Sequence, residues 1–243
     1  MDIYVINLEK EKYRKNYMIN LLNEIGFKHN VHFIKAIEGC ALEEKELKKM
    51  FDFIRHDNSY LWRITKEEIG CVLSHRKCYE SFLESNKNTA LILEDDVCFI
   101  TDIRPYLSFA EKFLNTDIPR ILLFSGWFWY TSSKKHDGNR RLCKIWDARL
   151  AHAYVINKTA ASIILNKRPW YLADHWNKIF KLGIEIYGLS PHLTTTNRDP
   201  RFKSAIQVGR PGIYNYSLRK WLTEKRCSLI RKSLKFMKNF EQA

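Results

Sequence analysis

The feature that most constrains the fold of this chain is an apolar run that ends in three consecutive carboxylates. Residues 89–93 read Thr-Ala-Leu-Ile-Leu, and Glu94, Asp95 and Asp96 follow them directly. A strand that is buried on both faces of a parallel sheet reads as a continuous run of apolar side chains. The acids cannot continue into the core, because burying an unpaired charge is unfavourable. We therefore expect a buried strand whose carboxyl end opens onto solvent or a ligand.

Acids at the end of a buried strand indicate a metal site. In open α/β sheets, ligands bind in the crevice outside the carboxyl ends of the strands. A hard divalent cation binds one or two carboxylates there together with substrate phosphates. The triplet at 94–96 therefore predicts a site for a metal-bound diphosphate, although a charged turn after a strand would give the same pattern.

The segments before the acidic strand predict an α/β fold. Apolar runs at residues 2–8 and 31–37 are typical of strands, and residues 9–25 between them have helical spacing, which makes a βαβ unit with a parallel sheet. Thr65 and Glu68 form a capping box at the start of a helix that leads into the acidic strand.

The rest of the chain continues this pattern without an internal repeat or a linker between domains. We expect strands at residues 120–125 and 151–156, a helix at 159–165, and a polar loop at 131–141. The chain is therefore interpreted as one α/β body.

Composition limits the partners and the compartment. The net charge of +14 predicts an acidic partner, for which nucleic acid, an anionic membrane and phosphorylated small molecules all qualify. The aromatic content of 14% exceeds what the core needs, so some rings are expected in a nucleotide or sugar cleft. Six scattered cysteines without a signal peptide are typical of reduced thiols in a cytosol. No apolar run is long enough to span a bilayer.

The segment 217–243 differs from the rest in charge. It contains eight Lys or Arg residues against Glu224 and Glu241, with Trp221, Leu222 and other apolar residues between them. A basic amphipathic helix with these side chains fits a helix that lies in a membrane interface. The alternative is a C-terminal helix that packs on the body and leaves a basic face in solvent.

Four stretches together resemble glycosyltransferase family 25. They are Val5-Ile6-Asn7-Leu8 with Arg14, Ala36-Ile37-Glu38-Gly39, the segment from Glu68 to His75, and the segment from Leu91 to Val97. The family usually has Asp where this chain has Glu38. His152 to Ile156, Ala173 to Trp176 and Pro191 follow in the expected order, so the resemblance covers about residues 2–210.

The resemblance implies a GT-A-type glycosyltransferase fold with a Rossmann-like, mixed but mostly parallel sheet flanked by helices. It also implies a UDP-sugar donor, Mn²⁺ or Mg²⁺, and inversion at the anomeric carbon. On this basis residues 1–100 are the expected nucleotide-sugar-binding half of a single domain and 101–216 the acceptor-binding half. The basic segment 217–243 lies outside the resemblance.

The acidic triplet is expected to bind the metal and the donor. Asp96 is the predicted metal ligand, with Glu94 as a second ligand, because successive strand side chains alternate in direction and the three acids cannot share one role. A late histidine, His192, is the expected third ligand. The predicted nucleotide-sugar contacts are Asn7, Arg14, Glu38, Gly39, Ser74, His75, Glu94 and Asp95.

An inverting transfer needs a carboxylate that takes the proton of the acceptor hydroxyl. Asp174, which lies between Trp170 and Trp176, is the predicted general base. Its rivals are Asp147, Glu185 and Asp199. The predicted acceptor contacts are Trp127, His152 and Trp176.

The predicted function is the metal-dependent, inverting transfer of a hexose, galactose in a β1,4 linkage, to a bacterial lipooligosaccharide or lipopolysaccharide acceptor. The protein would act in the bacterial cytoplasm, on the inner face of the membrane, through contact of 217–243 with anionic lipid. One alternative is a metal-dependent nucleotidyltransferase, against which the missing Gly-rich loop argues. The other is a basic nucleic-acid-binding protein, but no such motif occurs and the acids would repel phosphate, so no nucleic-acid partner is expected.

Overall fold

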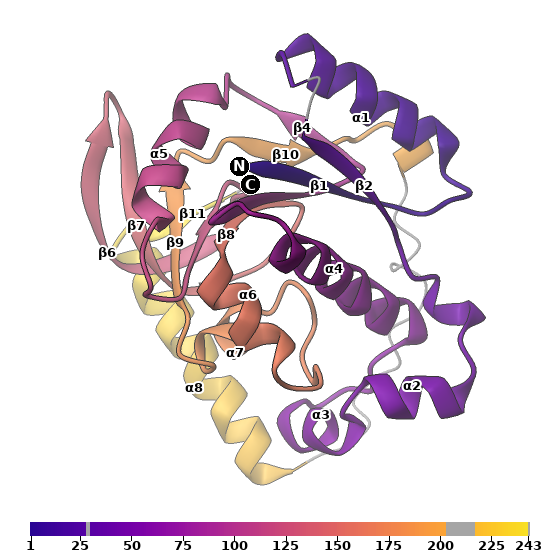
Figure 1. Ribbon diagram of the computed structural model, residues 1–243. Coiled ribbons are helices and arrows are strands. Elements are labelled where there is room, and N and C mark those ends of the chain that lie inside the picture. Colours follow the sequence, from indigo (N-terminus) through magenta and orange to yellow (C-terminus); the bar gives the residue numbers. More distant parts are fainter. Residues whose placement is uncertain (28–29, 203–216, 243) are drawn as a thin grey trace.

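The structure is a computed structural model that describes residues 1–27, 30–202 and 217–242. Its centre is a nine-stranded sheet with the strand order β11-β6-β7-β9-β5-β8-β3-β1-β2 (Figure 1). The strands are β1 (Asp2–Asn7), β2 (Val31–Lys35), β3 (Thr89–Glu94), β5 (Arg120–Leu123), β6 (Phe128–Asp137), β7 (Arg140–Ala148), β8 (Ala153–Asn157), β9 (Glu185–Ser190) and β11 (Phe240–Glu241). A separate two-stranded sheet pairs β4 (Val97–Phe99) with β10 (Thr194–Thr196).

The predicted βαβ unit and the α/β class are confirmed. β1 pairs in parallel with β2 and with β3, and β5 pairs in parallel with β9. The other neighbouring strands run antiparallel, including β8, which lies between β3 and β5. The sheet is therefore mixed, with a parallel N-terminal part at one edge.

Helices cover both faces of the sheet. Successive strand residues point to opposite faces, and in the central strands both sets are apolar and need cover. Ile3 and Val5 of β1 pack with α1 (Lys12–Glu24) and α5 (Arg104–Leu114). The alternate residues Tyr4 and Ile6 pack on the other face. That second face is covered by α4 (Lys66–Glu84), α6 (Lys158–Leu165) and α7 (Trp176–Phe180). The sheet thus forms the middle of three layers (Figure 1).

The helix α4 begins where the capping box predicts. The Thr65 hydroxyl accepts a hydrogen bond from the Glu68 amide at 3.2 Å, and the Glu68 carboxylate accepts one from the Thr65 amide at 2.9 Å. Before α4, the segment after β2 forms a short 3₁₀ turn, η1 (Gly39–Ala41), and two helices, α2 (Glu44–Met50) and α3 (Phe53–Ser59).

The polar loop predicted for residues 131–141 is wrong, because this segment belongs to the β6–β7 hairpin. Most of its side chains are exposed or half-buried, so no buried face produces an apolar alternation. The available signal was Asp137-Gly138, a favoured hairpin-turn dipeptide, and Gly138 has a φ of 39°.

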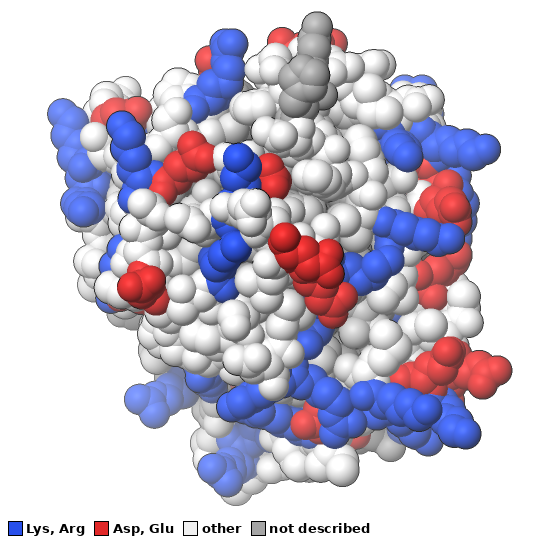
Figure 2. All heavy atoms as spheres, in the orientation of Figure 1, with Lys and Arg blue, Asp and Glu red and all other residues white. Residues whose placement is uncertain are grey.

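The basic C-terminal segment forms α8 (Leu218–Phe236) and β11. β11 adds to the sheet beside β6, and Leu234 of α8 is buried. Figure 2 shows Lys and Arg side chains along the lower edge of this face, over the region where Figure 1 places α2, α3 and α8. Among the described helices, none has the length and apolar character needed to cross a membrane.

Two glycines let α4 approach the loop after β2 closely. A Cβ on Gly70 would lie 2.6 Å from the Ile37 carbonyl oxygen and 2.7 Å from the Gly39 amide nitrogen. A Cβ on Gly39 would lie 1.7 Å from the Lys66 carbonyl oxygen. All three separations are far below ordinary contact, so a side chain at Gly39 or Gly70 would collide with the backbone of the neighbouring element.

Replacing Gly70 with Ala should therefore destabilise the protein by about 2 kcal/mol or more, because the methyl group meets backbone atoms that cannot rotate away. The sign is informative, since the same change in an unobstructed helix stabilises by about 1 kcal/mol. Urea unfolding followed by circular dichroism measures the difference. Gly138→Ala is the control: nothing lies within 4 Å of its Cβ position, so only its positive φ opposes the change, at about 1 kcal/mol. An unchanged stability for Gly70→Ala would contradict the close packing.

Candidate functional site

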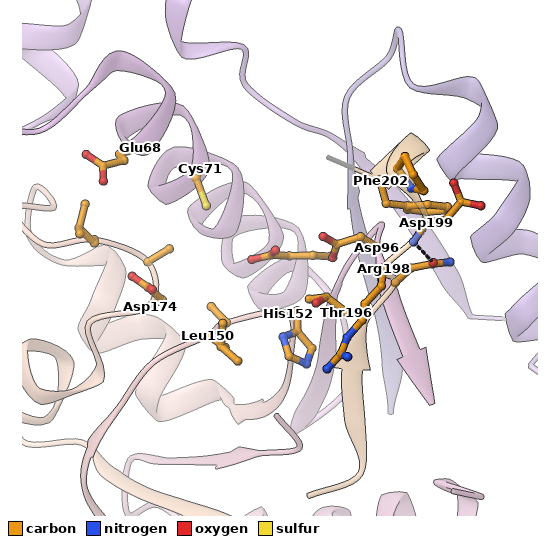
Figure 3. A pocket seen from close by; sticks show the side chains of 16 residues that line it. Glu68, Cys71, Asp96, Leu150, His152, Asp174, Thr196, Arg198, Asp199 and Phe202 are labelled. Atoms are coloured by element: carbon orange, nitrogen blue, oxygen red, sulfur yellow. Dashed lines mark hydrogen bonds between the residues drawn. The ribbon is translucent and has the colours of Figure 1, made fainter. Parts of the chain in front are cut away.

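A pocket of about 830 Å³ opens at the carboxyl end of β3. Figure 3 shows Glu68, Cys71 and Asp174 toward one end, Arg198, Asp199 and Phe202 toward the other, and Asp96 and His152 between them. Its walls come from α4, the end of β3, the loop before β8, the loop before α7, and the segment after β10. The acidic strand end therefore lies at the middle of an elongated cleft.

Strand register decides what each member of the acidic triplet contacts. Ile6 of β1 pairs with Glu94 of β3, which places Asn7 beside Asp95. Asn7 Nδ2 donates to Asp95 Oδ2 at 2.7 Å, and Arg14 Nη1 from α1 donates to Asp95 Oδ1 at 2.9 Å. The structure brings these three predicted nucleotide contacts together, but none of them lines the pocket. Their observed role is to hold the turn after β3.

Asp96 is the least compensated member of the triplet among the described residues. Its Oδ1 atom is buried and has no hydrogen-bond partner among the described residues. Burial and the neighbouring charges of Glu94 and Asp95 raise the pKa of Asp96 to about 7. A buried carboxylate in this state is stabilised by a nearby cation. Asp96 lines the pocket, as a metal ligand must.

The Glu94 carboxylate is the end of a buried chain of hydrogen bonds that runs through His75 and Tyr154 to Tyr79. Glu94 Oε1 lies 3.2 Å from His75 Nε2, and His75 Nδ1 lies 2.8 Å from the Tyr154 hydroxyl, which contacts the Tyr79 hydroxyl. Burial acts to raise the pKa of Glu94, but the hydrogen bond with His75 and the electrostatic effects of His75, His152 and Arg14 together bring it below its ordinary value. His75 is buried and does not line the pocket. Its observed contacts therefore position Glu94, in place of the direct contact with the nucleotide-sugar that the sequence predicted.

His152 lies opposite Glu94 across the β3–β8 pair. Leu93 pairs with Ala153, and the Glu94 amide donates to the His152 carbonyl at 2.9 Å. The His152 Nε2 atom contacts Thr194 Oγ1 at 3.1 Å, whereas Nδ1 is buried without a hydrogen-bond partner among the described residues. Burial lowers the pKa of His152, which favours the neutral ring. If Nε2 carries the proton toward Thr194, Nδ1 presents a lone pair.

Asp174 is the candidate base that the pocket geometry favours. Asp147 and Glu185 do not line the pocket, and their carboxylates pair with arginines, at 2.7 Å to Arg231 and 2.8 Å to Arg120 respectively.

Asp199 does line the pocket, at the end opposite Asp174. Its hydrogen bonds to Arg201 lower its pKa to about 2, which makes it a weak base.

Three predicted contacts lie elsewhere. His192 Nδ1 bonds to Glu241 of β11 at 2.7 Å and does not line the pocket, so it is not positioned as a metal ligand. Trp176 is 1% exposed, and its Nε1 donates to the Leu150 carbonyl at 2.9 Å, so it packs in the core. Trp127 is exposed but also lies outside the pocket lining.

Glu38 and Ser74 also lack direct access to the pocket. Glu38 is half-buried and pairs with Lys10. Ser74 is buried: its hydroxyl donates to the Gly70 carbonyl at 2.7 Å and accepts from the Ile37 amide at 2.8 Å. Together with Gly39, Ser74 thus joins α4 to the loop after β2.

Apart from Asp199, a rival for the general base, the segment after β10 was not predicted as part of the site. The β4–β10 pairing continues into a hydrogen bond from the Asn197 amide to the Asp96 carbonyl at 2.7 Å. This places η2 (Pro200–Phe202) against α1, where Phe202 packs edge-on to Tyr13 and Tyr17. A three-residue strand gives too short a pattern to detect from sequence.

Comparison with known proteins identifies the family of this chain. The family model described as Glycosyltransferase family 25 (LPS biosynthesis protein) matches residues 1–151, which is more than half of the chain. The chain therefore belongs to glycosyltransferase family 25.

Three relatives illustrate the range of the family. A glycosyltransferase 25 family member of Aedes aegypti is 34% identical over 128 residues, or 51% of this chain and 20% of that protein. Procollagen galactosyltransferase 2 of Homo sapiens is 32% identical over 101 residues, or 40% of this chain and 16% of that protein. Inactive glycosyltransferase 25 family member 3 of Homo sapiens is 28% identical over 106 residues, or 42% of this chain and 18% of that protein. The chain thus spans about a fifth or less of each relative's length.

The raised pKa of Asp96 predicts a measurable effect on stability. The contribution of Asp96 to the free energy of unfolding has its full value below pH 3.8, the ordinary Asp pKa. This contribution is lost as the pH rises through the folded pKa of about 7. Asp96→Asn removes that loss, so in EDTA the variant should be more stable than the wild type at pH 8 by on the order of 2 kcal/mol. Urea unfolding from pH 4 to pH 8 should show this difference growing with pH.

The matched control is Asp102→Asn. Hydrogen bonds to Arg104 lower the pKa of Asp102, and its side chain is exposed, so this variant should show no gain at pH 8. A difference between Asp96→Asn and the wild type that does not change with pH would show that Asp96 titrates normally.

Proposed function

We propose that this protein is a metal-dependent glycosyltransferase that transfers a hexose from a UDP-sugar with inversion. The observation that carries the proposal is a pair of buried atoms, Asp96 Oδ1 and His152 Nδ1, that have no hydrogen-bond partner among the described residues and lie in one pocket with Glu94. Because one relative is named as inactive, membership of the family alone does not establish that this protein is active. The main support for activity is therefore the presence of these three side chains in one pocket.

The donor atoms suit Mn²⁺ or Mg²⁺. We propose Asp96, Glu94 and His152 as the ligands, with His152 in place of His192. A cation bound there would act as a Lewis acid that neutralises the diphosphate leaving group. Cys71 also lies near His75 and Glu94, with one atom of each within 4.8 Å of the others. Burial raises the pKa of Cys71 well above its ordinary value, so the protonated thiol is a poor ligand, and the oxygen donors favour a hard cation.

The two ends of the pocket would serve donor and acceptor. At the Phe202 end, Phe202 and Arg198 line the pocket. The Phe202 ring packs against Tyr17, with ring centroids 5.0 Å apart, and against the Arg14 guanidinium, both outside the pocket lining. Aromatic and cationic groups of this kind suit a nucleotide. We place the uridine there, in a GT-A-type arrangement.

At the other end, Asp174 would receive the acceptor proton. As the acceptor hydroxyl oxygen attacks the anomeric carbon, its proton would pass to the Asp174 carboxylate, and the bond to UDP would break on the opposite face of the sugar. Glu68 lines the same end. Its carboxylate is partly committed to capping α4, so it is less suited to accept the proton.

Galactose, in a β1,4 linkage, is the proposed sugar, and a bacterial lipooligosaccharide or lipopolysaccharide is the proposed acceptor. The name of the human galactosyltransferase supports the sugar, and the description of the family model supports the acceptor. Such an acceptor is held in a membrane, so the proposed location is the inner face of the bacterial cytoplasmic membrane.

The first test is UDP release from a panel of UDP-sugars with Mn²⁺ and with EDTA. One donor, with UDP-galactose expected, should be turned over only with the metal. Asp96→Asn should lower turnover at saturating metal by about 10²-fold because it removes a ligand charge, whereas the surface control Asp102→Asn should not. If UDP fails to bind with metal present and no donor is turned over, the proposal is overturned.

A second test separates the base from the donor site. Asp174→Asn should lower kcat for transfer by about 10²-fold or more while leaving the Kd for UDP with Mn²⁺ unchanged. Calorimetry measures the binding, and Asp199→Asn in parallel tests the rival carboxylate. A loss of UDP binding in Asp174→Asn would place this residue in the donor site instead.

A further inference from the structure

The outer face of α8 carries an apolar stripe. Leu218, Leu222, Leu229 and Phe236 are 62%, 52%, 67% and 91% exposed. At about 100° per residue, these four side chains fall within a sector of about 40° around the helix axis. Within the described part of the chain, the stripe is left largely open to solvent along the helix. Such a row differs from the single exposed apolar residues that are normal on protein surfaces.

Cations flank this stripe on both sides. On a helical projection, Lys225 and Lys232 fall on one side and Arg219 and Arg226 on the other, and all four are exposed. The acidic residue of α8, Glu224, lies on the half-buried side toward the body. The outer face therefore combines apolar and positively charged groups without a carboxylate.

The inner face fixes the orientation of the helix. Arg231 Nε donates to Asp147 Oδ2 at 2.7 Å, and Asp147 is completely buried. Lys220 donates to the Asp57 carbonyl of α3, and Leu234 is buried against the body. Rotating α8 to hide the stripe would break these contacts, so the stripe is a fixed feature of the surface.

We propose that this face of α8 lies in the interface of an anionic lipid bilayer. An apolar stripe between two rows of cations is the arrangement in which apolar side chains reach the acyl boundary while Lys and Arg reach the headgroup phosphates. A second copy of this chain is a poorer occupant, because a twofold contact would bring the same cations together. A nucleic acid would use the cations but would leave the Leu and Phe side chains without a partner.

The position of α8 gives this contact a consequence for the reaction. The N-terminal end of α8 lies beside α3 through Lys220 and Asp57. Just after α3, the Tyr60 hydroxyl lies 3.1 Å from His175 Nδ1, next to Asp174 in the chain. The bilayer would therefore be near the Asp174 end of the pocket, where a lipid-linked acceptor is needed. This consequence rests on the proposed function, whereas the lipid contact itself does not.

The test is flotation of the full chain with phosphatidylcholine vesicles, with and without about 30% phosphatidylglycerol. The wild type should float with the anionic vesicles, and less so at high salt. Leu222→Glu with Leu229→Glu should lower the partition constant by about 10-fold or more. Lys225→Gln with Lys232→Gln should lower it by about 10-fold on anionic vesicles, an effect that high salt should largely remove.

The matched control is Ile100→Glu with Ile118→Glu, at two side chains that are 51% and 46% exposed and are not part of α8. It should float like the wild type. Circular dichroism should show that all variants fold. The proposal is overturned if the wild type does not float, or if the α8 and control variants float equally well.

Two further readouts test a second copy of the chain and a nucleic acid as occupants of the stripe. Light scattering that shows a dimer dissociated by the Leu222 and Leu229 changes, without any vesicle binding, would assign the stripe to a second copy and overturn the proposal. Binding of random oligonucleotides in place of vesicles would do the same. UDP release without an acceptor should be unaffected by the α8 changes, so failure of lipid binding and failure of the proposed transferase function are distinguishable.

Discussion

The pairing of β3 with β1 on one side and β8 on the other is the constraint on which the site depends. The parallel register with β1 places Asn7 beside Asp95, and the antiparallel register with β8 places His152 beside Glu94. A shift of either register by one residue would turn these side chains to the opposite face. Backbone pairing thus places different neighbours beside Asp95 and Glu94 before any ligand binds.

The three carboxylates consequently differ in how they are compensated. Asp95 accepts hydrogen bonds from Asn7 and Arg14, and Glu94 faces His75. Asp96 keeps a buried oxygen that has no partner among the described residues, and its pKa is raised. Burial also raises the pKa of Asp95, but the unfavourable electrostatics are greatest at Asp96, at the centre of the pocket. Binding a cation there would remove a penalty that the folded protein already carries, which links affinity for the cation to stability.

The parts of this arrangement that are local in the chain could be predicted from sequence. The acid-ended strand, the βαβ unit and the capping box of α4 each lie within a short segment and have a clear pattern. The partner histidine could not be predicted in the same way. A buried strand has the same apolar sequence whether it runs parallel or antiparallel, so nothing in residues 153–157 indicates that His152 faces Glu94. Likewise, Trp176 looks like a sugar platform until its burial is known.

Two residues that the sequence suggested for chemistry instead contact the C-terminal segment. Asp147, a rival for the base, binds Arg231 of α8, and His192, the expected metal ligand, binds Glu241 of β11. Both contacts are largely shielded from solvent: Asp147 is fully buried, and the His192 and Glu241 side chains are about 15% exposed. They attach the basic segment to the sheet at two points, so α8 cannot move independently of the pocket. If its outer face rests on a bilayer, these polar contacts set the orientation of the pocket toward that bilayer.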